Sequence, residues 1–136
     1  MYARNGASTV LLKQGIALGG NQTLGLVNPM MPTFAANTEP HLLKEIIQRL
    51  EAYGSGQLLL DRYGLSNCIG FSPEDMALVY DDMCLEAGVT VLYHTTLVEA
   101  MYSKNRIQYC IIQTPSVAKP LYWVCVNSGA SRASLL

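Results

Sequence analysis

LGGNQTLG, residues Leu18 to Gly25, is the most distinctive stretch of the sequence. The adjacent glycines Gly19 and Gly20 permit backbone conformations and close approaches that a Cβ would block. The N–H groups around Asn21 are then open to an anion, and Thr23 adds a hydroxyl donor. This combination suits a pyrophosphate at the start of a helical turn. A pair of glycines is also common in ordinary turns, so the stretch alone does not decide between the two.

The residues before this loop predict a helix end followed by a strand. Tyr2–Ser8 has the pattern of a helix ending in a turn, with Gly6 just past the end. Thr9–Leu12 is a nearly continuous apolar run, which predicts a strand buried on both faces in a parallel sheet. The region from Gly15 to Pro32 is rich in glycine and proline and predicts a loop with at most one helical turn.

The first predicted helix begins after Thr38, which is a suitable N-cap, with Glu39-Pro40 in the first turn. Apolar residues recur at helical spacing from Leu42 to Leu50, and Gly54 ends the helix. Residues 55 to 71 are ambiguous, with Leu58-Leu59-Leu60 as a short candidate strand. The region therefore contributes one amphipathic helix that packs against a core.

The second predicted helix covers Pro73–Ala87, with Ser72 as N-cap and two acids in the first turn. A strand over Val89–Leu92 follows directly. β-branched and aromatic residues dominate the last third, which predicts a β-meander and a strand returning toward the main sheet. The predicted strands are Thr95–Tyr102, Ile107–Gln113 and Leu121–Val126. The pattern as a whole predicts an α/β fold.

Composition excludes several classes of function. Half of the 136 residues are hydrophobic, 14% are charged, and the net charge of −1 is spread without a run, so we expect neither nucleic acid nor a membrane as a partner. The first residues lack the apolar stretch of a secretory signal, so we expect a cytoplasmic protein. The four cysteines form no CxxC pair, and a metal site is not predicted.

The order of these segments resembles one family. The chain is similar to FAD-dependent oxidoreductases whose flavin domain is distantly similar to the fumarate reductase flavoproteins. The resemblance covers most of the chain, strongly from Asn5 to about Val98 and weakly after Pro115. The segments that carry it are Asn5–Ser8, Val10–Leu12, Leu18–Pro32, His41–Leu50, Phe71–Tyr80 and Glu86–Thr95.

The resemblance implies a Rossmann-like domain that binds FAD in extended form. It places the Gly19-Gly20 pair and Thr23 along the pyrophosphate and toward the flavin, and the backbone of Val98 beside adenine. Ser128-Gly129 stands where the family has a short glycine turn that closes onto the cofactor. The flavin itself carries the hydride or electron in such enzymes, so no catalytic side chain is predicted.

The chain also departs from the family pattern. It contains no GxGxxG, and it opens near the end of the helix that follows this motif in the family. Lys13 stands where an acid would accept hydrogen bonds from the ribose hydroxyls, and lysine only donates. No aspartate flanks Ser128-Gly129, and the sequence ends at Leu136 before most of a substrate domain.

We therefore expect one partial FAD-binding domain over residues 1–136, an incomplete Rossmann-like fold with a C-terminal β-meander. It lacks the first strand and the GxGxxG loop, and it is expected to bind FAD weakly or not at all. Strand edges left unpaired are predicted places of association. The alternative is a non-catalytic remnant or interaction module without flavin. A different nucleotide-binding α/β protein is less favoured, because GxGxxG and GxxxxGK[ST] are both absent.

Overall fold

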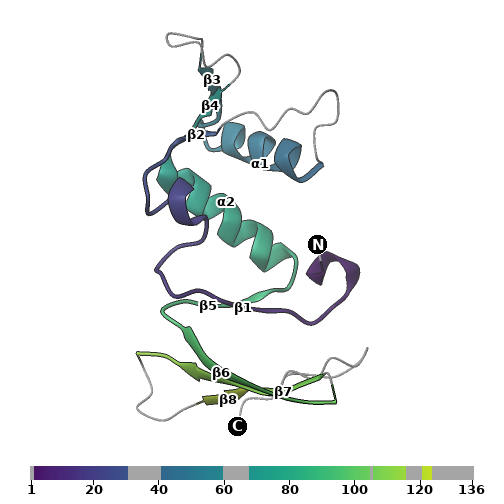
Figure 1. The fold of residues 1–136 in the computed structure, drawn as a ribbon. Coiled ribbons are helices and arrows are strands. Elements are labelled where there is room, and N and C mark those ends of the chain that lie inside the picture. The colour runs from purple at the N-terminus through teal and green to yellow at the C-terminus, as the bar shows by residue number, and fades with distance from the viewer. Residues whose placement is uncertain (1, 31–40, 60–67, 105, 116–120, 124–136) are drawn as a thin grey trace. The chain divides into compact units, whose positions relative to one another are not determined.

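The structure is a computed structural model that describes residues 2–30, 41–59, 68–104, 106–115 and 121–123. The chain forms two compact units (Figure 1). One unit comprises Ala17–Met83, and the other comprises Met1–Ile16 together with Cys84–Leu136. Both helices and strands are present, in agreement with the predicted α/β class.

The unit Ala17–Met83 combines a small antiparallel sheet with two helices. The sheet order is β2-β4-β3, and the helices are α1 and α2, most of which belongs to this unit. The sequence predicts β3 as a short strand but neither β2 nor β4. The bounds are β2 (Pro29–Met30), α1 (His41–Ala52), β3 (Gln57–Leu59), β4 (Cys68–Gly70) and α2 (Pro73–Glu86).

The helix α2 confirms the prediction made from its capping sequence. The hydroxyl oxygen of Ser72 accepts a hydrogen bond from the Asp75 N–H at 3.3 Å and satisfies one donor of the first turn. Glu74 and Asp75 lie in that turn, where the helix dipole favours negative charge. Gly88, with φ of +69°, follows the end of the helix, and the predicted strand appears as β5 (Thr90–Leu92).

The helix α1 ends as predicted. The Gly54 N–H donates to the Glu51 carbonyl at 3.0 Å, and the φ of Gly54 is +80°, a conformation that favours glycine after a helix. Arg49 forms an ion pair with Glu45 at 2.9 Å, one turn earlier on the same helix. The predicted cap at Thr38 lies outside the described residues.

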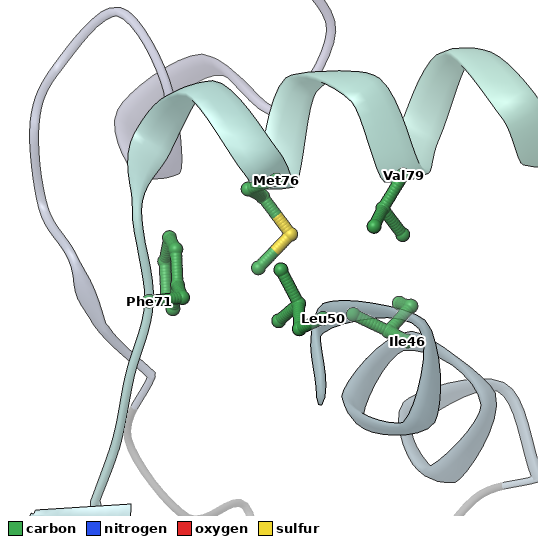
Figure 2. Packing of buried hydrophobic residues seen from close by; sticks show 5 residues of the cluster. All are labelled: Ile46, Leu50, Phe71, Met76 and Val79. Carbon is green, nitrogen blue, oxygen red and sulfur yellow. The ribbon is translucent and has the colours of Figure 1, made fainter. Parts of the chain in front are cut away.

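The core of this unit lies between the two helices (Figure 2). Leu50 of α1 and Met76 and Val79 of α2 are completely buried. Met76 points from α2 toward Leu50, and Val79 points toward Ile46. Phe71, directly before α2, completes the cluster of five residues. The apolar residues predicted at helical spacing in each helix therefore contribute to one shared core.

The unit that contains both chain termini begins with a 3-10 turn, η1 (Ala3–Asn5), which Gly6 ends with φ of +85°. The strand β1 (Val10–Leu12) follows and pairs in parallel with β5, in the register Leu11↔Val91. The parallel pairing confirms the prediction from the sequence, but the strand is not buried on both faces as predicted. Leu11 is 39% exposed, because this sheet has only two strands among the described residues.

The same unit also contains a three-stranded antiparallel sheet in the order β6-β7-β8. Its strands are β6 (Thr96–Ser103), β7 (Arg106–Gln113) and β8 (Leu121–Trp123). β8 pairs with β7 through Cys110↔Trp123, so the expected return of this strand toward the main sheet is wrong for its described residues. Pairing with the preceding strand requires only a short connection, which favours it over a return to a distant sheet.

The described residues contain neither a membrane-spanning helix nor a metal-binding cluster. Neither α1 nor α2 has the length and apolar character needed to cross a membrane. Within the same residues, no group of three or more histidine, cysteine, aspartate or glutamate side chains is placed to hold a metal ion.

Candidate functional site

The glycine loop lies between β1 and β2 and contains a 3-10 turn, η2 (Gly20–Gln22). Gly19 has φ of +89° and Gly20 has φ of +53°. Residues with a Cβ rarely adopt these values, so the prediction that at least one of the pair takes a conformation favouring glycine is confirmed.

The two glycines are required for different reasons. A Cβ placed on Gly19 would lie 2.7 Å from Thr23 Cγ2 and 2.7 Å from Tyr80 Cε2, so packing excludes it. A Cβ on Gly20 would have no atom within 4 Å. Gly20 therefore has open space where a Cβ would stand, whereas Thr23 and Tyr80 leave no room for a Cβ on Gly19.

The loop holds itself together with backbone hydrogen bonds. The Gln22 N–H donates to the Gly19 carbonyl at 3.1 Å, and the N–H groups of Thr23 and Gly25 both donate to the Gly20 carbonyl. Among the described residues, no carbonyl accepts from the N–H groups of Gly20 or Asn21. Asn21 is exposed to solvent. Within the described residues, these two adjacent backbone donors therefore have no backbone acceptor, at the place where the sequence predicts an anion.

Thr23 does not have the role of anion donor that the sequence predicts. Its side chain is buried, with 4% exposed, and its hydroxyl donates to the Leu18 carbonyl at 2.5 Å. A hydroxyl that donates inside the loop has no proton left for a phosphate. In this conformation Thr23 therefore stabilises the turn, and the candidate donors to an anion are the backbone N–H groups of Gly20 and Asn21.

Lys13 directly follows β1 in the other unit. Its N–H donates to the Leu92 carbonyl at 2.9 Å, and its own carbonyl accepts from the Thr95 N–H at 3.0 Å. These bonds fix the Lys13 backbone against the chain that follows β5. The partly buried side chain is an ammonium donor, so no acceptor for ribose hydroxyls stands at this position.

Val98 lies on β6 of the same unit as Lys13 and is 59% exposed. The register passes from Leu97↔Ile112 directly to Glu99↔Ile111, so Val98 occupies a β-bulge without a partner on β7. A bulge releases backbone groups from the ladder of strand hydrogen bonds. This is compatible with a contact between the Val98 backbone and a ligand.

The predicted site residues fall into separate groups. Gly19, Gly20, Asn21 and Thr23 share one loop in the unit Ala17–Met83, whereas Lys13 and Val98 belong to the other unit. Ser128 and Gly129 lie outside the described residues.

A surface hollow of about 290 Å³ lies elsewhere, lined by Arg49, Ala52, Tyr53 and Asp82. It contains none of the predicted site residues. The Tyr53 hydroxyl donates to Asp82 Oδ2 at 2.7 Å, and this hydrogen bond raises the pKa of the Tyr53 phenol.

Sequence reasoning missed one residue at the glycine loop. Tyr80 is predicted only as part of the apolar face of α2, yet its hydroxyl donates to Gln22 Oε1 at 2.6 Å. Helical spacing places Tyr80 on the core side but does not indicate which loop its ring and hydroxyl contact.

Comparison with known protein families shows which family the chain belongs to. The model of the family described as FAD dependent oxidoreductase matches residues 1–121. This chain belongs to that family. The family implies FAD as the cofactor. Comparison with the curated proteins gives no match.

A solved structure, that of THI4 from Thermovibrio ammonificans, has a similar fold, with a TM-score of 0.53 and 14% sequence identity. The similarity covers 88% of this chain and 46% of that chain, so the present chain spans less than half the length of THI4. At this identity the similarity shows the fold alone.

The described residues fit FAD only in part. The open N–H groups of Gly20 and Asn21, next to a position that tolerates close approach, suit the oxygens of a pyrophosphate. Lys13 does not suit the ribose, and the Thr23 hydroxyl is already engaged. The loop therefore offers donors that suit a pyrophosphate, whereas Lys13 offers no acceptor that would suit a ribose.

Proposed function

We propose that the chain is part of a Rossmann-like FAD-binding domain of a flavin-dependent oxidoreductase, with a β-meander toward its C-terminus. The flavin would supply the hydride or electron transfer when bound. The observation that supports the proposal most directly is the Gly19-Gly20 turn. It follows a strand of a parallel pair and leaves two N–H groups open.

The proposed contacts follow the chain. The N–H groups of Gly20 and Asn21 donate to the pyrophosphate, while Gly19 and Thr23 hold the loop in shape. The bulged backbone at Val98 lies beside adenine. Lys13 is assigned to the ribose, and the family's glycine turn at Ser128-Gly129 lies outside the described residues. No side chain of the chain is assigned a chemical step.

We further propose that the isolated chain binds FAD weakly and does not catalyse a redox reaction by itself. A charge-assisted hydrogen bond contributes about 1.5–3 kcal/mol, and Lys13 forgoes the one that an acid would make to the ribose. The sequence also contains no GxGxxG, the motif whose glycines approach the pyrophosphate most closely. We expect a dissociation constant above roughly 10 μM, which corresponds to less than about 7 kcal/mol.

Titration of the purified chain with FAD, followed by flavin fluorescence or heat, tests both parts of the proposal. Saturation in the range of tens to hundreds of micromolar is expected. Stoichiometric submicromolar binding would contradict weak binding, and no binding at millimolar FAD would contradict the flavin assignment. FMN provides the matched ligand, because it lacks the adenosine and the pyrophosphate and should bind less well than FAD.

The variant Gly20→Asp tests the role of the loop. Its carboxylate would stand beside the two open N–H groups, where it repels a pyrophosphate, and the position has room for a side chain. Gly6→Asp is the matched control, because Gly6 also has a positive φ and open surroundings. Loss of FAD binding in the first variant alone is expected. Equal binding in both variants would remove the loop from the site.

A second candidate is a non-catalytic interaction module, and the edge of β1 favours it. Val10 and Leu12 alternate with residues that bond to β5, so their backbone groups point to the other edge. Within the described residues this edge has no further strand. If the chain is colourless, fails to bind FAD and sediments as a dimer, this candidate replaces the first.

A further inference from the structure

The side chain of Tyr80 contacts the glycine loop at two points. At one end of the turn its ring packs against Gly19, since a Cβ there would lie 2.7 Å from Cε2 and 3.0 Å from Cδ2. At the other end its hydroxyl donates to Gln22 Oε1 at 2.6 Å. One side chain from α2 therefore contacts both ends of the turn whose N–H groups remain open.

Tyr80 is itself held by the core. It packs against the cluster that contains Met76 and Val79, two completely buried residues of the same helix. Burial also raises the pKa of the Tyr80 phenol above its ordinary value, so the phenol remains protonated and able to donate throughout the neutral range. The contact therefore connects the glycine loop to the buried core of the unit.

We infer that Tyr80 is the positioning residue of the glycine loop, because it selects the conformation in which the N–H groups of Gly20 and Asn21 face outward. The inference rests on the proposed function, since the loop is assigned there to the pyrophosphate. Tyr80 does not touch the cofactor in this arrangement. It acts through Gly19 and Gln22.

The physical reason is the entropy of a loop rich in glycine. Gly19, Gly20 and Gly25 give residues 19–25 many accessible backbone conformations, and a ligand that needs one of them pays the cost of ordering the loop. The Gln22 bond spans 58 residues of sequence, so the loop acquires this restraint only when the unit is folded. Once folded, the loop is preorganised, and the ligand no longer bears the ordering cost.

Amide hydrogen exchange in the ligand-free chain tests the inference. The probes are the N–H groups of Gln22, Thr23 and Gly25, which donate within the loop. Tyr80→Phe keeps the ring on Gly19 but removes the hydroxyl, and Gln22→Ala removes the acceptor. Each variant should increase exchange at the three probes by about three- to tenfold, the effect expected from one side-chain hydrogen bond.

Tyr53→Phe is the matched control. It also removes a tyrosine hydroxyl that donates to a residue of α2, Asp82, but at a position away from the loop. Exchange at the loop probes should match that of the parent chain in this variant. Unchanged exchange in Tyr80→Phe and Gln22→Ala would overturn the inference, and so would equal acceleration in Tyr53→Phe, which indicates general loosening.

FAD affinity supplies the second measurement. Tyr80→Phe and Gln22→Ala should weaken FAD binding by about three- to tenfold, the combined variant should weaken it no further, and Tyr53→Phe should leave it unchanged. If the parent chain does not bind FAD, the proposed function fails, but the exchange experiment still decides the role of Tyr80. If FAD binds and Tyr80→Phe alters exchange without altering affinity, Tyr80 is structural and the inference fails.

Discussion

Gly19 and Gly6 have nearly the same backbone conformation in different surroundings. Their φ angles are +89° and +85°, but a Cβ on Gly6 would meet nothing within 4 Å, whereas one on Gly19 would overlap Thr23 and Tyr80. Both Gly→Ala variants bear the cost of a left-handed conformation, about 1–3 kcal/mol.

Gly19→Ala should therefore lower the free energy of unfolding by about 1–3 kcal/mol more than Gly6→Ala does, because only Gly19→Ala forces the core against α2 to shift. Urea unfolding of the two variants measures the difference. Equal losses would mean that the Tyr80 ring yields without cost.

Lys13 is the residue whose chemistry disagrees most with a flavin site. We expect Lys13→Glu to tighten FAD binding by about tenfold or more, because a carboxylate accepts the ribose hydrogen bonds that an ammonium cannot accept. Lys44→Glu is the control, since it changes the net charge equally at an exposed position on α1. No gain in affinity relative to Lys44→Glu would show that Lys13 does not face the ribose.

Single residues show what a sequence conveys and what it does not. The positive φ angles at the glycine pair follow from glycine itself, and they were predictable. The engagement of the Thr23 hydroxyl was not, because a threonine in a turn donates outward or inward according to the fold of the loop. The contact of Tyr80 with Gln22 depends on the placement of α2 beside the loop, which no local pattern contains.

At the level of elements, the N-cap of α2 makes its own contribution to the free energy of unfolding, which a single substitution can measure. Ser72→Ala should cost about 1 kcal/mol of the free energy of unfolding, because the Asp75 N–H loses its acceptor. Urea unfolding measures this loss. Ser72→Asp, which restores an acceptor, should recover part of it. A loss in Ser72→Asp as large as in Ser72→Ala would place the effect outside the cap.

The same N-cap residue, Ser72, makes part of the stability of α2 depend on pH. The Ser72 hydroxyl donates to Glu74 Oε2 at 2.7 Å, and this bond holds the pKa of Glu74 below its ordinary value of 4.5. The folded state therefore favours the carboxylate. Its contribution to stability is present above pH 4.5 and is lost as the pH falls through the lowered pKa. In Ser72→Ala the pKa of Glu74, followed by NMR titration, should rise toward 4.5, and an unchanged pKa would contradict this account.

The helices and strands differ in how clearly the sequence predicts them. The helices α1 and α2 combine apolar spacing with capping or terminating residues, and both were predictable. The two-residue strand β2 and the strand β4 are too short to display a period, so only their pairing defines them. The exposure of Leu11 has a similar origin, because an apolar run predicts a strand but not the number of layers that cover it.

At the level of the whole molecule, the predicted α/β class is confirmed, but the sequence did not predict how all the strands pair into sheets. Parallel pairing of β1 with β5 follows from an apolar run before the loop and another after α2. The pairing of β8 with β7 depends on long-range competition between partners for Leu121–Trp123. Membership of the FAD-dependent oxidoreductase family rests on the family model that matches residues 1–121.

The concentration of buried residues has a consequence for the stability of the molecule. Among the described residues, five of the buried hydrophobic residues form one cluster between α1 and α2, and Leu50 is completely buried within it. Leu50→Ala removes buried methyl groups and leaves a cavity, which costs about 2–5 kcal/mol in well-packed cores. A loss of that size is a large part of the stability of a small domain.

We therefore expect Leu50→Ala to lower the free energy of unfolding by about 2–5 kcal/mol, with accelerated amide exchange throughout residues 41–52 and 73–83. Leu78→Ala is the matched control, because Leu78 lies on α2 with 49% of its side chain exposed, and it should cost less than about 1 kcal/mol. Urea unfolding and hydrogen exchange on the two variants measure both quantities. Similar losses from the buried and the exposed leucine would show that the cluster between α1 and α2 is not the main source of stability.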